Sequence, residues 1–163
     1  VMERTDKHNY YLDIAQTVSE RSTCLRKHYG AIIVVKDQII ATGYNGAPRG
    51  RRNCIDLQFC MREKLNIPRG ERYELCRSVH AEANCIISAP RSEMIGGTLY
   101  MACINPKTGE LEPGTTSCAM CKRLIINAGI DRVIVRETKD TWSEYLARDW
   151  IFNDDSLTDT FGY

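Results

Sequence analysis

The chain has 163 residues, of which 43% are hydrophobic, and this fits one compact domain whose core needs no disulfide bonds. Its formal net charge of +1 gives no general reason to expect a nucleic acid, a membrane surface or an acidic partner. We expect a cytoplasmic protein, because no apolar stretch is long enough for a bilayer and residues 3–7 carry charges instead of a signal-peptide core.

The first predicted elements are a helix and a hairpin. Apolar residues recur on one face over residues 9–21, which predicts an amphipathic helix. Two apolar runs flank Lys36-Asp37-Gln38 in "AIIVVKDQIIATGYNG" and predict a β-hairpin. Residues 47–77 are polar, rich in arginine and cysteine and without periodicity, so we expect a long loop inserted into the domain.

The alternation continues in the second half. We expect a buried helix over 81–88, a strand in "GGTLYMACI", turns over 105–116, a helix over 118–127 and a strand in "DRVIVRE". "TWSEYLARDWI" predicts a last helix, followed by a loose acidic tail. This order predicts a layered α/β domain over residues 1–163, with strands that are at least partly parallel.

Cys118 and Cys121 stand where one of these helices begins. Residues three apart share a helix face, so both sulfurs can reach one ion at about 2.3 Å. We expect Ser117 to cap the helix and to place Cys118 in its first turn, where the helix dipole favours the thiolate. A single CxxC also fits a redox motif or chance, and no second CxxC is present to complete a four-cysteine zinc ribbon.

His80 offers a third ligand at another helix start, after the cap candidate Ser78. Helices that follow strands of one sheet begin at the same edge of it, so the imidazole should meet the two sulfurs. One imidazole and two thiolates leave a zinc ion with an open position for water, which is typical of a catalytic site. Glu82 would then be a general acid/base beside the metal and not a ligand. Each of these residues alone is more often structural, but together they favour one site.

These motifs resemble deoxycytidylate (dCMP) deaminases, which belong to the zinc-dependent cytidine deaminase-like superfamily. The resemblance lies in "RSTCLRKHYGAIIVVKDQIIATGYNGAPRG", "HAEANCI" and "CAMCKRLIINAGIDRVIV", which cover most of residues 10–136. It implies a three-layer α/β/α sandwich with a mixed five-stranded sheet and the hydrolysis of dCMP to dUMP and ammonia, which supplies thymidylate synthesis. It also implies a homo-oligomer, in many members a hexamer, that is activated by dCTP and inhibited by dTTP, with Mg²⁺ accompanying the triphosphate.

The resemblance also implies roles for individual residues. The ligands of the catalytic zinc and the residue that moves the proton would be His80, Cys118, Cys121 and Glu82. The residues that contact the nucleoside part of the substrate would be Asn45 and Ala81. This chain departs from the family pattern in two places: Ser117 stands where a proline is usual, and the turn segment 105–116 is longer than expected.

The inserted loop suggests a second metal site and a phosphate site. Its cysteines and a neighbouring one would hold a structural zinc that pins the loop: Cys24, Cys54, Cys60 and Cys76. Unpaired reduced thiols are the alternative, and His28 could replace one ligand, whereas Cys85 and Cys103 read as core. We expect Arg26, and after it Arg49, to bind the phosphate, because the guanidinium fork suits it. Arg91 is a candidate contact for an effector.

Three other functions remain as alternatives. A deaminase of bases in RNA or DNA would need a broadly basic face with stacking aromatic rings, which a pI near 7.7 and an acidic tail disfavour. A free-nucleoside deaminase would need no cation for a phosphate. A zinc module that only binds partners would have no use for Glu82 or for an open zinc position.

Overall fold

The computed structural model describes residues 2–154 and residue 157. Five strands form one sheet in the order β2-β1-β3-β4-β5. Their bounds are β1 (His28–Val35), β2 (Gln38–Tyr44), β3 (Thr98–Ile104), β4 (Arg132–Arg136) and β5 (Trp142–Leu146). The pair β3–β4 is parallel and the other three pairs are antiparallel, so the predicted mixed five-stranded sheet is confirmed.

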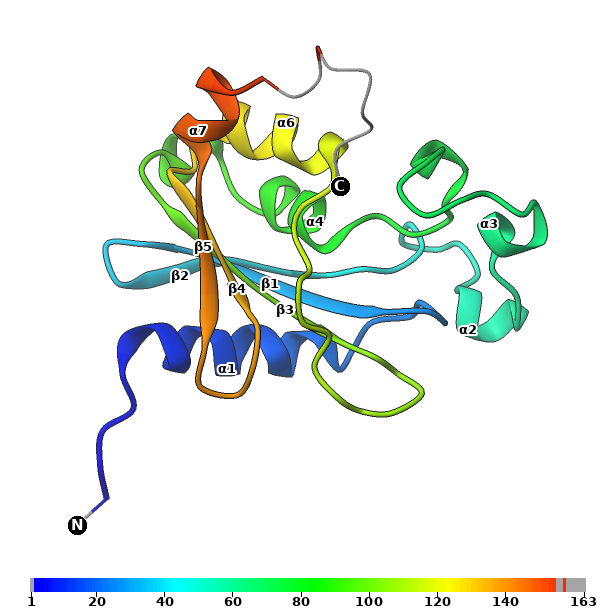
Figure 1. Ribbon diagram of the computed structural model, residues 1–163, viewed down its shortest axis with the longest axis horizontal. Helices are drawn as coiled ribbons and strands as arrows, with labels where there is room; N and C mark the ends of the chain where they lie inside the picture. The colour runs from blue at the N-terminus through cyan, green and yellow to red at the C-terminus, as the bar shows by residue number, and fades with distance from the viewer. Residues whose placement is uncertain (1, 155–156, 158–163) are drawn as a thin grey trace.

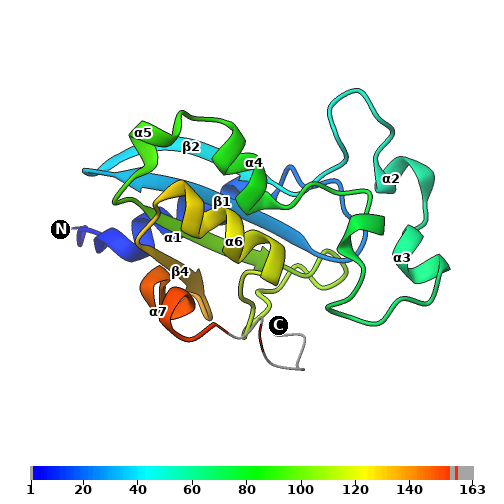
Figure 2. The ribbon, with the colours of Figure 1, turned by 90° about the horizontal axis from the view of Figure 1, so that it is seen from above.

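Helices cover both faces of this sheet (Figure 1). Helix α1 (Lys7–Ser19) lies on one face, and the other face carries α4 (Ala81–Ile87), α5 (Arg91–Met94; labelled in Figure 2), α6 (Ala119–Ala128) and α7 (Ala147–Phe152). Figure 2 shows α4 and α6 next to each other across the strands. The predicted three-layer α/β/α sandwich is therefore confirmed.

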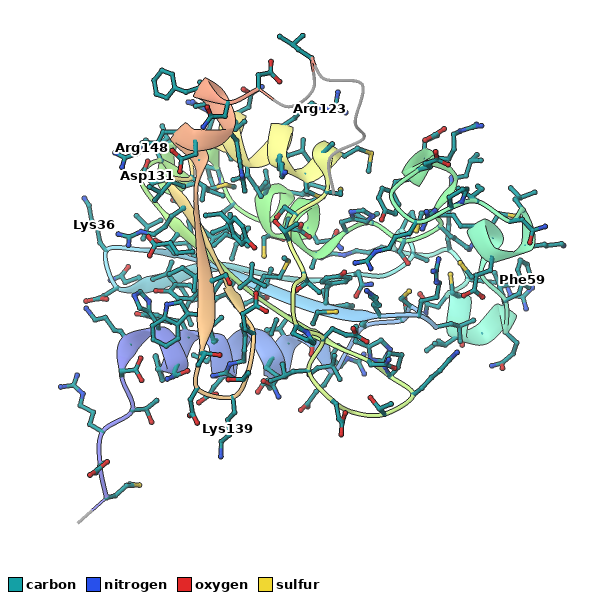
Figure 3. The ribbon with its side chains drawn as sticks, in the orientation of Figure 1. Lys36, Phe59, Arg123, Asp131, Lys139 and Arg148 are labelled. Atoms are coloured by element: carbon teal, nitrogen blue, oxygen red, sulfur yellow. The ribbon has the colours of Figure 1, made fainter. Side chains whose placement is uncertain are left out.

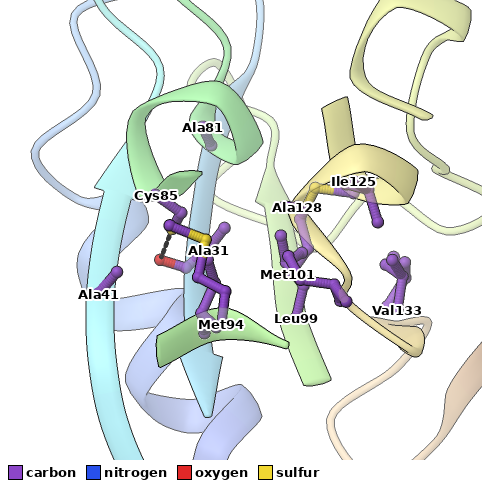
Figure 4. Packing of buried hydrophobic residues seen from close by; sticks show 13 residues of the cluster. Ala31, Ala41, Ala81, Cys85, Met94, Leu99, Met101, Ile125, Ala128 and Val133 are labelled. Carbon is purple, nitrogen blue, oxygen red and sulfur yellow. Dashed lines mark hydrogen bonds between the residues drawn. The ribbon is translucent and has the colours of Figure 1, made fainter. Parts of the chain in front are cut away.

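The three central strands, β1, β3 and β4, are apolar along most of their length because both of their faces are buried. In β1, Ile32 and Val34 belong to the core under α1, whereas Ala31 and Ile33 belong to the core under α4 and α6. Successive side chains of a strand point to opposite faces, so one apolar run supplies both cores. The Cys85 thiol of α4 donates a hydrogen bond to the Ala31 carbonyl at 3.1 Å (Figure 4).

The C-terminal prediction was wrong in part. Residues 142–146 of "TWSEYLARDWI" form strand β5, and the helix begins only at Ala147. The physical reason is the edge of β4: its backbone groups need partners, and β5 supplies them in an antiparallel ladder in which Arg132 lies opposite Leu146. Most of the predicted acidic tail, residues 155–156 and 158–163, lies outside the described residues.

The inserted segment, residues 47–77, contains short helical pieces. They are α2 (Cys54–Leu57), α3 (Met61–Lys64) and a 3₁₀ turn, η1 (Tyr73–Leu75). In Figure 1 this segment projects from one end of the sheet, beyond the start of α4. Within the described part of the chain, every helix is too short or too polar to span a bilayer.

We expect Gly43→Ala to destabilise the fold, because helix α4 packs with its backbone directly on this glycine. A Cβ atom at Gly43 would lie 2.6 Å from both the Ala81 carbonyl oxygen and the Cys85 amide nitrogen. The helix would have to move away from β2, at a cost of about 1–3 kcal/mol in the free energy of unfolding. Urea denaturation of Gly43→Ala and of Thr42→Ala, an exposed neighbour on the same strand, measures this cost; equal stability of the two variants would contradict the packing argument.

Candidate metal centre and active site

Strand direction brings two helix starts to one edge of the sheet. Strands β2 and β3 both run antiparallel to β1, which lies between them, so they point the same way. Helix α6 follows β3 directly, and α4 follows β2 after the inserted segment. After the inserted segment the chain returns to the end of β2, where Val79 pairs with Gly46. The Val79 amide donates to the Gly46 carbonyl at 2.7 Å, and the Gly46 amide donates to the Val79 carbonyl at 3.2 Å. The start of α4 is thereby fixed to the end of β2.

The metal-ligand candidates occupy the caps of these two helices. His80 is the N-cap of α4 and Cys118 is the N-cap of α6, both with extended backbone, and Cys121 is the third residue of α6. The expectation that Ser78 and Ser117 cap the helices was wrong. Two of the three candidate ligands thus stand at helix caps, and the third lies in the first turn of α6.

His80, Cys118 and Cys121 meet at this edge. The His80 Nδ1 atom lies 3.4 Å from the Cys118 sulfur and 3.4 Å from the Cys121 sulfur. Nitrogen and sulfur ligands at zinc bond lengths stand about 3.6 Å apart in a tetrahedron. Among the described residues, this is where three metal-ligating side chains come within 4.8 Å of one another. The three atoms therefore fit a single zinc ion.

The charges of the site suit a divalent cation. Both sulfurs are nearly inaccessible, since Cys118 is 7% exposed and Cys121 is 1% exposed. Hydrogen bonding from Cys121 lowers the pKa of Cys118, with His80 acting in the same direction, whereas the same contact and burial raise the pKa of Cys121. Two thiolates would neutralise a divalent ion, which reduces the cost of burying it.

Glu82 lies in the first turn of α4 and is 4% exposed. Burial raises the pKa of its carboxyl above the usual 4.5, and the nearby His80 opposes that shift. Ser117 also lies near this carboxyl and favours the ionised form of Glu82. Among the described residues, no group lies at hydrogen-bond geometry to the Ser117 hydroxyl. A carboxyl with a raised pKa can both accept and return a proton near neutral pH.

The Asn45 side chain holds the segment between α1 and β1. Its side-chain oxygen accepts hydrogen bonds from the Tyr29 amide, at 2.9 Å, and from the Ser22 hydroxyl. Its side-chain nitrogen donates to the Lys27 carbonyl at 2.9 Å. A carboxamide carries two N–H donors, so one remains for a ligand. Ala81, the other predicted nucleoside contact, is fully buried as the first residue of α4.

The two predicted phosphate arginines, Arg26 and Arg49, are both accessible to solvent. Arg26 is half-exposed, and its Nε atom pairs with the Glu63 carboxylate of α3 at 3.0 Å. Such a pair contributes about 1 kcal/mol or less, so a phosphate could displace it. Arg49 is exposed beyond the "GYNG" loop. Arg91 donates a hydrogen bond to the Asn127 carbonyl at 2.6 Å, which links α5 to the end of α6.

The four cysteines predicted to bind a second metal are neighbours, but they do not form a compact cluster. Burial raises the pKa of the Cys54 thiol, and the charges of Cys24, Cys60 and Cys76 add to the shift. No three of these sulfurs, all of which the structure describes, come within 4.8 Å of one another. His28 uses its Nε2 atom in a hydrogen bond with the Cys24 carbonyl at 2.9 Å.

Two tyrosines near the site were missed in the sequence. The Tyr73 ring lies against the His80 imidazole with 5.1 Å between the ring centroids. Burial raises the pKa of Tyr29 on β1, and Cys103 and Glu82 add to that shift. Neither tyrosine belongs to a spacing motif, so a single sequence held no signal that could have singled them out.

Comparison with known proteins identifies the family. The protein-family model described as "Cytidine and deoxycytidylate deaminase zinc-binding region" matches residues 5–137. The deoxycytidylate deaminase of Mycobacterium phage D29 is 36% identical over 138 residues, which are 82% of this chain and 96% of that protein. The deoxycytidylate deaminase of Schizosaccharomyces pombe is 31% identical over 126 residues. The aligned residues cover 77% of this chain but only 35% of the yeast protein.

Solved structures agree with this assignment. The dCMP deaminase of cyanophage S-TIM5 in apo form superposes with a TM-score of 0.57 and 25% identity, over 85% of this chain and 88% of that one. Its complex with dCMP and dUMP gives a TM-score of 0.56 at 24% identity, over 83% and 84% of the two chains. The family match includes His80, Glu82, Cys118 and Cys121. The chain therefore belongs to the cytidine and deoxycytidylate deaminase family, whose members are hydrolytic deaminases with a zinc-binding region.

Proposed function

We propose that this protein is a zinc-dependent deaminase that hydrolyses dCMP to dUMP and ammonia and so supplies dUMP for thymidylate synthesis. The observation that carries the proposal is the cluster of His80, Cys118 and Cys121 with the buried Glu82 two residues from the histidine. The names of the phage and yeast relatives favour dCMP over other cytosine compounds.

The proposed chemistry divides between the metal and Glu82. A bound zinc would acidify a water molecule to a pKa of about 7. Glu82 takes a proton from the attacking water and gives it to N3 of the pyrimidine while oxygen adds at C4. Glu82 then carries the proton of the new C4 hydroxyl to the amino group, which leaves as ammonia. The sum is cytosine plus water to uracil plus ammonia, with Glu82 returned to its initial state.

The proposed substrate contacts are Asn45 and Arg26. The remaining N–H of Asn45 would bind the sugar, and Arg26 would exchange Glu63 for the phosphate. Buried hydroxyls without a hydrogen-bond partner among the described residues precede the two ligand helices: Ser78, Thr115 and Ser117. A bound polar molecule would satisfy such groups, and this supports a ligand at the starts of α4 and α6.

A structural zinc held by Cys24, Cys54, Cys60 and Cys76 remains part of the proposal. It is supported by their mutual proximity around Cys54 and by their place in a segment with little regular structure. Metal binding would draw the four sulfurs together and pin the inserted segment. Zinc analysis that finds two ions per chain in the wild-type protein would support both sites.

Regulation by dCTP and dTTP with Mg²⁺, a homo-oligomeric state and a cytoplasmic location are proposals that rest on the resemblance to dCMP deaminases. The eight cysteines, all free thiols in the structure, support a reducing compartment. The basic character of residues 49–77, with eight Arg or Lys and four acids, supports a site for anionic effectors.

The proposed substrate is tested by a comparison of three compounds. Purified protein is given dCMP, deoxycytidine and cytosine, and ammonia release is measured. We expect release from dCMP with a kcat/KM at least about 10²-fold above that for deoxycytidine, because a charged hydrogen-bonded phosphate contact contributes about 3 kcal/mol. Equal rates for dCMP and deoxycytidine would favour a nucleoside deaminase, and no release from any compound would favour a non-catalytic zinc module.

A further inference from the structure

An arginine, a tyrosine and a histidine form a stack that joins the inserted segment to the proposed metal centre. The Tyr73 ring meets the His80 imidazole edge-on, with centroids 5.1 Å apart and planes at 81°. The guanidinium carbon of Arg62 lies 4.3 Å from the centroid of the same tyrosine ring. The stack therefore runs from α3, inside the inserted segment, to a candidate zinc ligand.

Arg62 is held firmly in this stack. It is 5% exposed, and its Nη2 atom donates hydrogen bonds to the Pro68 carbonyl at 2.8 Å and the Glu71 carbonyl at 3.0 Å. None of the ion pairs among the described residues includes Arg62, and its buried Nε has no hydrogen-bond partner there. Burying a charge without a carboxylate partner is a poor source of stability. The burial of Arg62 is better explained by its contact with the Tyr73 ring, which it holds in position.

We propose that Tyr73 is a positioning residue that fixes the orientation of the His80 imidazole toward Cys118 and Cys121, and that Arg62 holds Tyr73 in place. His80 is the cap of α4, so its side chain extends beyond the helix and needs a neighbour to prevent rotation. Ligand histidines are commonly oriented by contacts outside the metal's own ligand set. Here an aromatic ring nearly at right angles to the imidazole provides such a contact, and the Cys76 thiol faces the same imidazole. The inference rests on the proposed metal centre.

The stack is tested by metal binding, with no need for substrate. The full chain is prepared as wild type, Tyr73→Leu, Tyr73→Phe and Arg62→Met. Zinc affinity is measured by competition with a chromophoric chelator, and the visible absorption spectrum is recorded after cobalt substitution. Phe59→Leu is the matched control, because Phe59 lies in the same segment beside Cys60 and has its own cation, the Lys64 Nζ atom 5.0 Å from its ring. Figure 3 shows Phe59 on the outer side of the segment.

We expect Tyr73→Leu to weaken zinc binding by about 10-fold or more and to shift the cobalt bands. Tyr73→Phe keeps the ring and should stay within about 2-fold of the wild type, whereas Arg62→Met should shift both readouts in the same direction as Tyr73→Leu. Phe59→Leu should change neither. This pattern would assign the effect to the ring against His80 and not to general disturbance of the segment.

An unchanged zinc affinity and cobalt spectrum in folded Tyr73→Leu would overturn the inference, even if that variant melts at a lower temperature. Tyr73→Met fills the site without a ring and is measured by the same two readouts, so the test does not depend on one variant folding. A wild-type chain that takes up neither zinc nor cobalt would overturn the metal centre itself. The two results can be told apart, because an unchanged Tyr73→Leu overturns only the positioning role and leaves the proposed deaminase activity standing.

Discussion

Glu82→Gln is expected to lower kcat for dCMP deamination by about 10²- to 10⁴-fold, the usual contribution of a positioned general acid/base. Glutamine has nearly the shape of glutamate but cannot accept the proton of the attacking water. Because Glu82 is not a proposed ligand, the variant should retain as much zinc as the wild type. Steady-state kinetics and metal analysis of the same preparation measure both quantities.

Glu144→Gln is the control for this prediction. Glu144 is an exposed carboxylate on β5 that pairs with Arg132 at 3.3 Å, on a different strand from any proposed site residue. Its replacement should leave kcat within about 2-fold, since surface pairs contribute little. A Glu82→Gln enzyme with wild-type turnover would remove Glu82 from the mechanism, whereas loss of turnover together with loss of zinc would indicate a role in metal binding.

Cys121→Ser is expected to remove one zinc ion per chain and with it the deaminase activity. A structural zinc ion with four ligands is bound with about 10–16 kcal/mol of free energy. By the same measure, the loss of one thiolate costs about 3 kcal/mol, or roughly 10²-fold in zinc affinity. Cys121 is 1% exposed, so no solvent-derived ligand of comparable strength can replace it easily. Metal analysis after dialysis against a mild chelator gives the zinc content of the variant.

Cys85→Ser provides the matched sulfur-to-oxygen control. Cys85 is a fully buried thiol on α4 that donates a hydrogen bond to the Ala31 carbonyl, and a serine hydroxyl can make the same bond. This variant should keep both zinc and activity. If Cys121→Ser kept its full zinc content, Cys121 would not be a ligand and the three-atom cluster would need another explanation.

Much of the fold was predictable because its signals are local. The runs "AIIVV" and "RVIVR" are apolar throughout or nearly so, as expected for strands buried on both faces, and Gly129 ends α6 in a left-handed conformation. Strand β5 was not predictable in the same way. Its residues pair with β4 in an antiparallel hairpin across residues 137–141, but "WSEYL" has no apolar run and neither of its ends is marked by glycine or proline, so its local strand signal is weak.

The metal ligands were predictable because sequence spacing sets their geometry. Cys118 and Cys121 are three residues apart at one helix start, and His80 begins a helix at the same sheet edge. The predicted caps, Ser78 and Ser117, lie two residues and one residue before the observed caps, His80 and Cys118. Serine is a common helix cap, but here the ligand residue that follows it has the extended backbone of the cap position. Tyr73 and Arg62 were not predictable, because the inserted segment lacks periodicity and its contacts with His80 depend on tertiary structure.

The most direct test of the account is a crystal of the zinc-loaded protein measured at the zinc absorption edge. We predict an anomalous-scattering peak about 2.0–2.3 Å from the His80 Nδ1 atom and from the sulfurs of Cys118 and Cys121. A zinc-containing crystal with no peak between these three atoms would contradict the metal centre and the deaminase chemistry built on it.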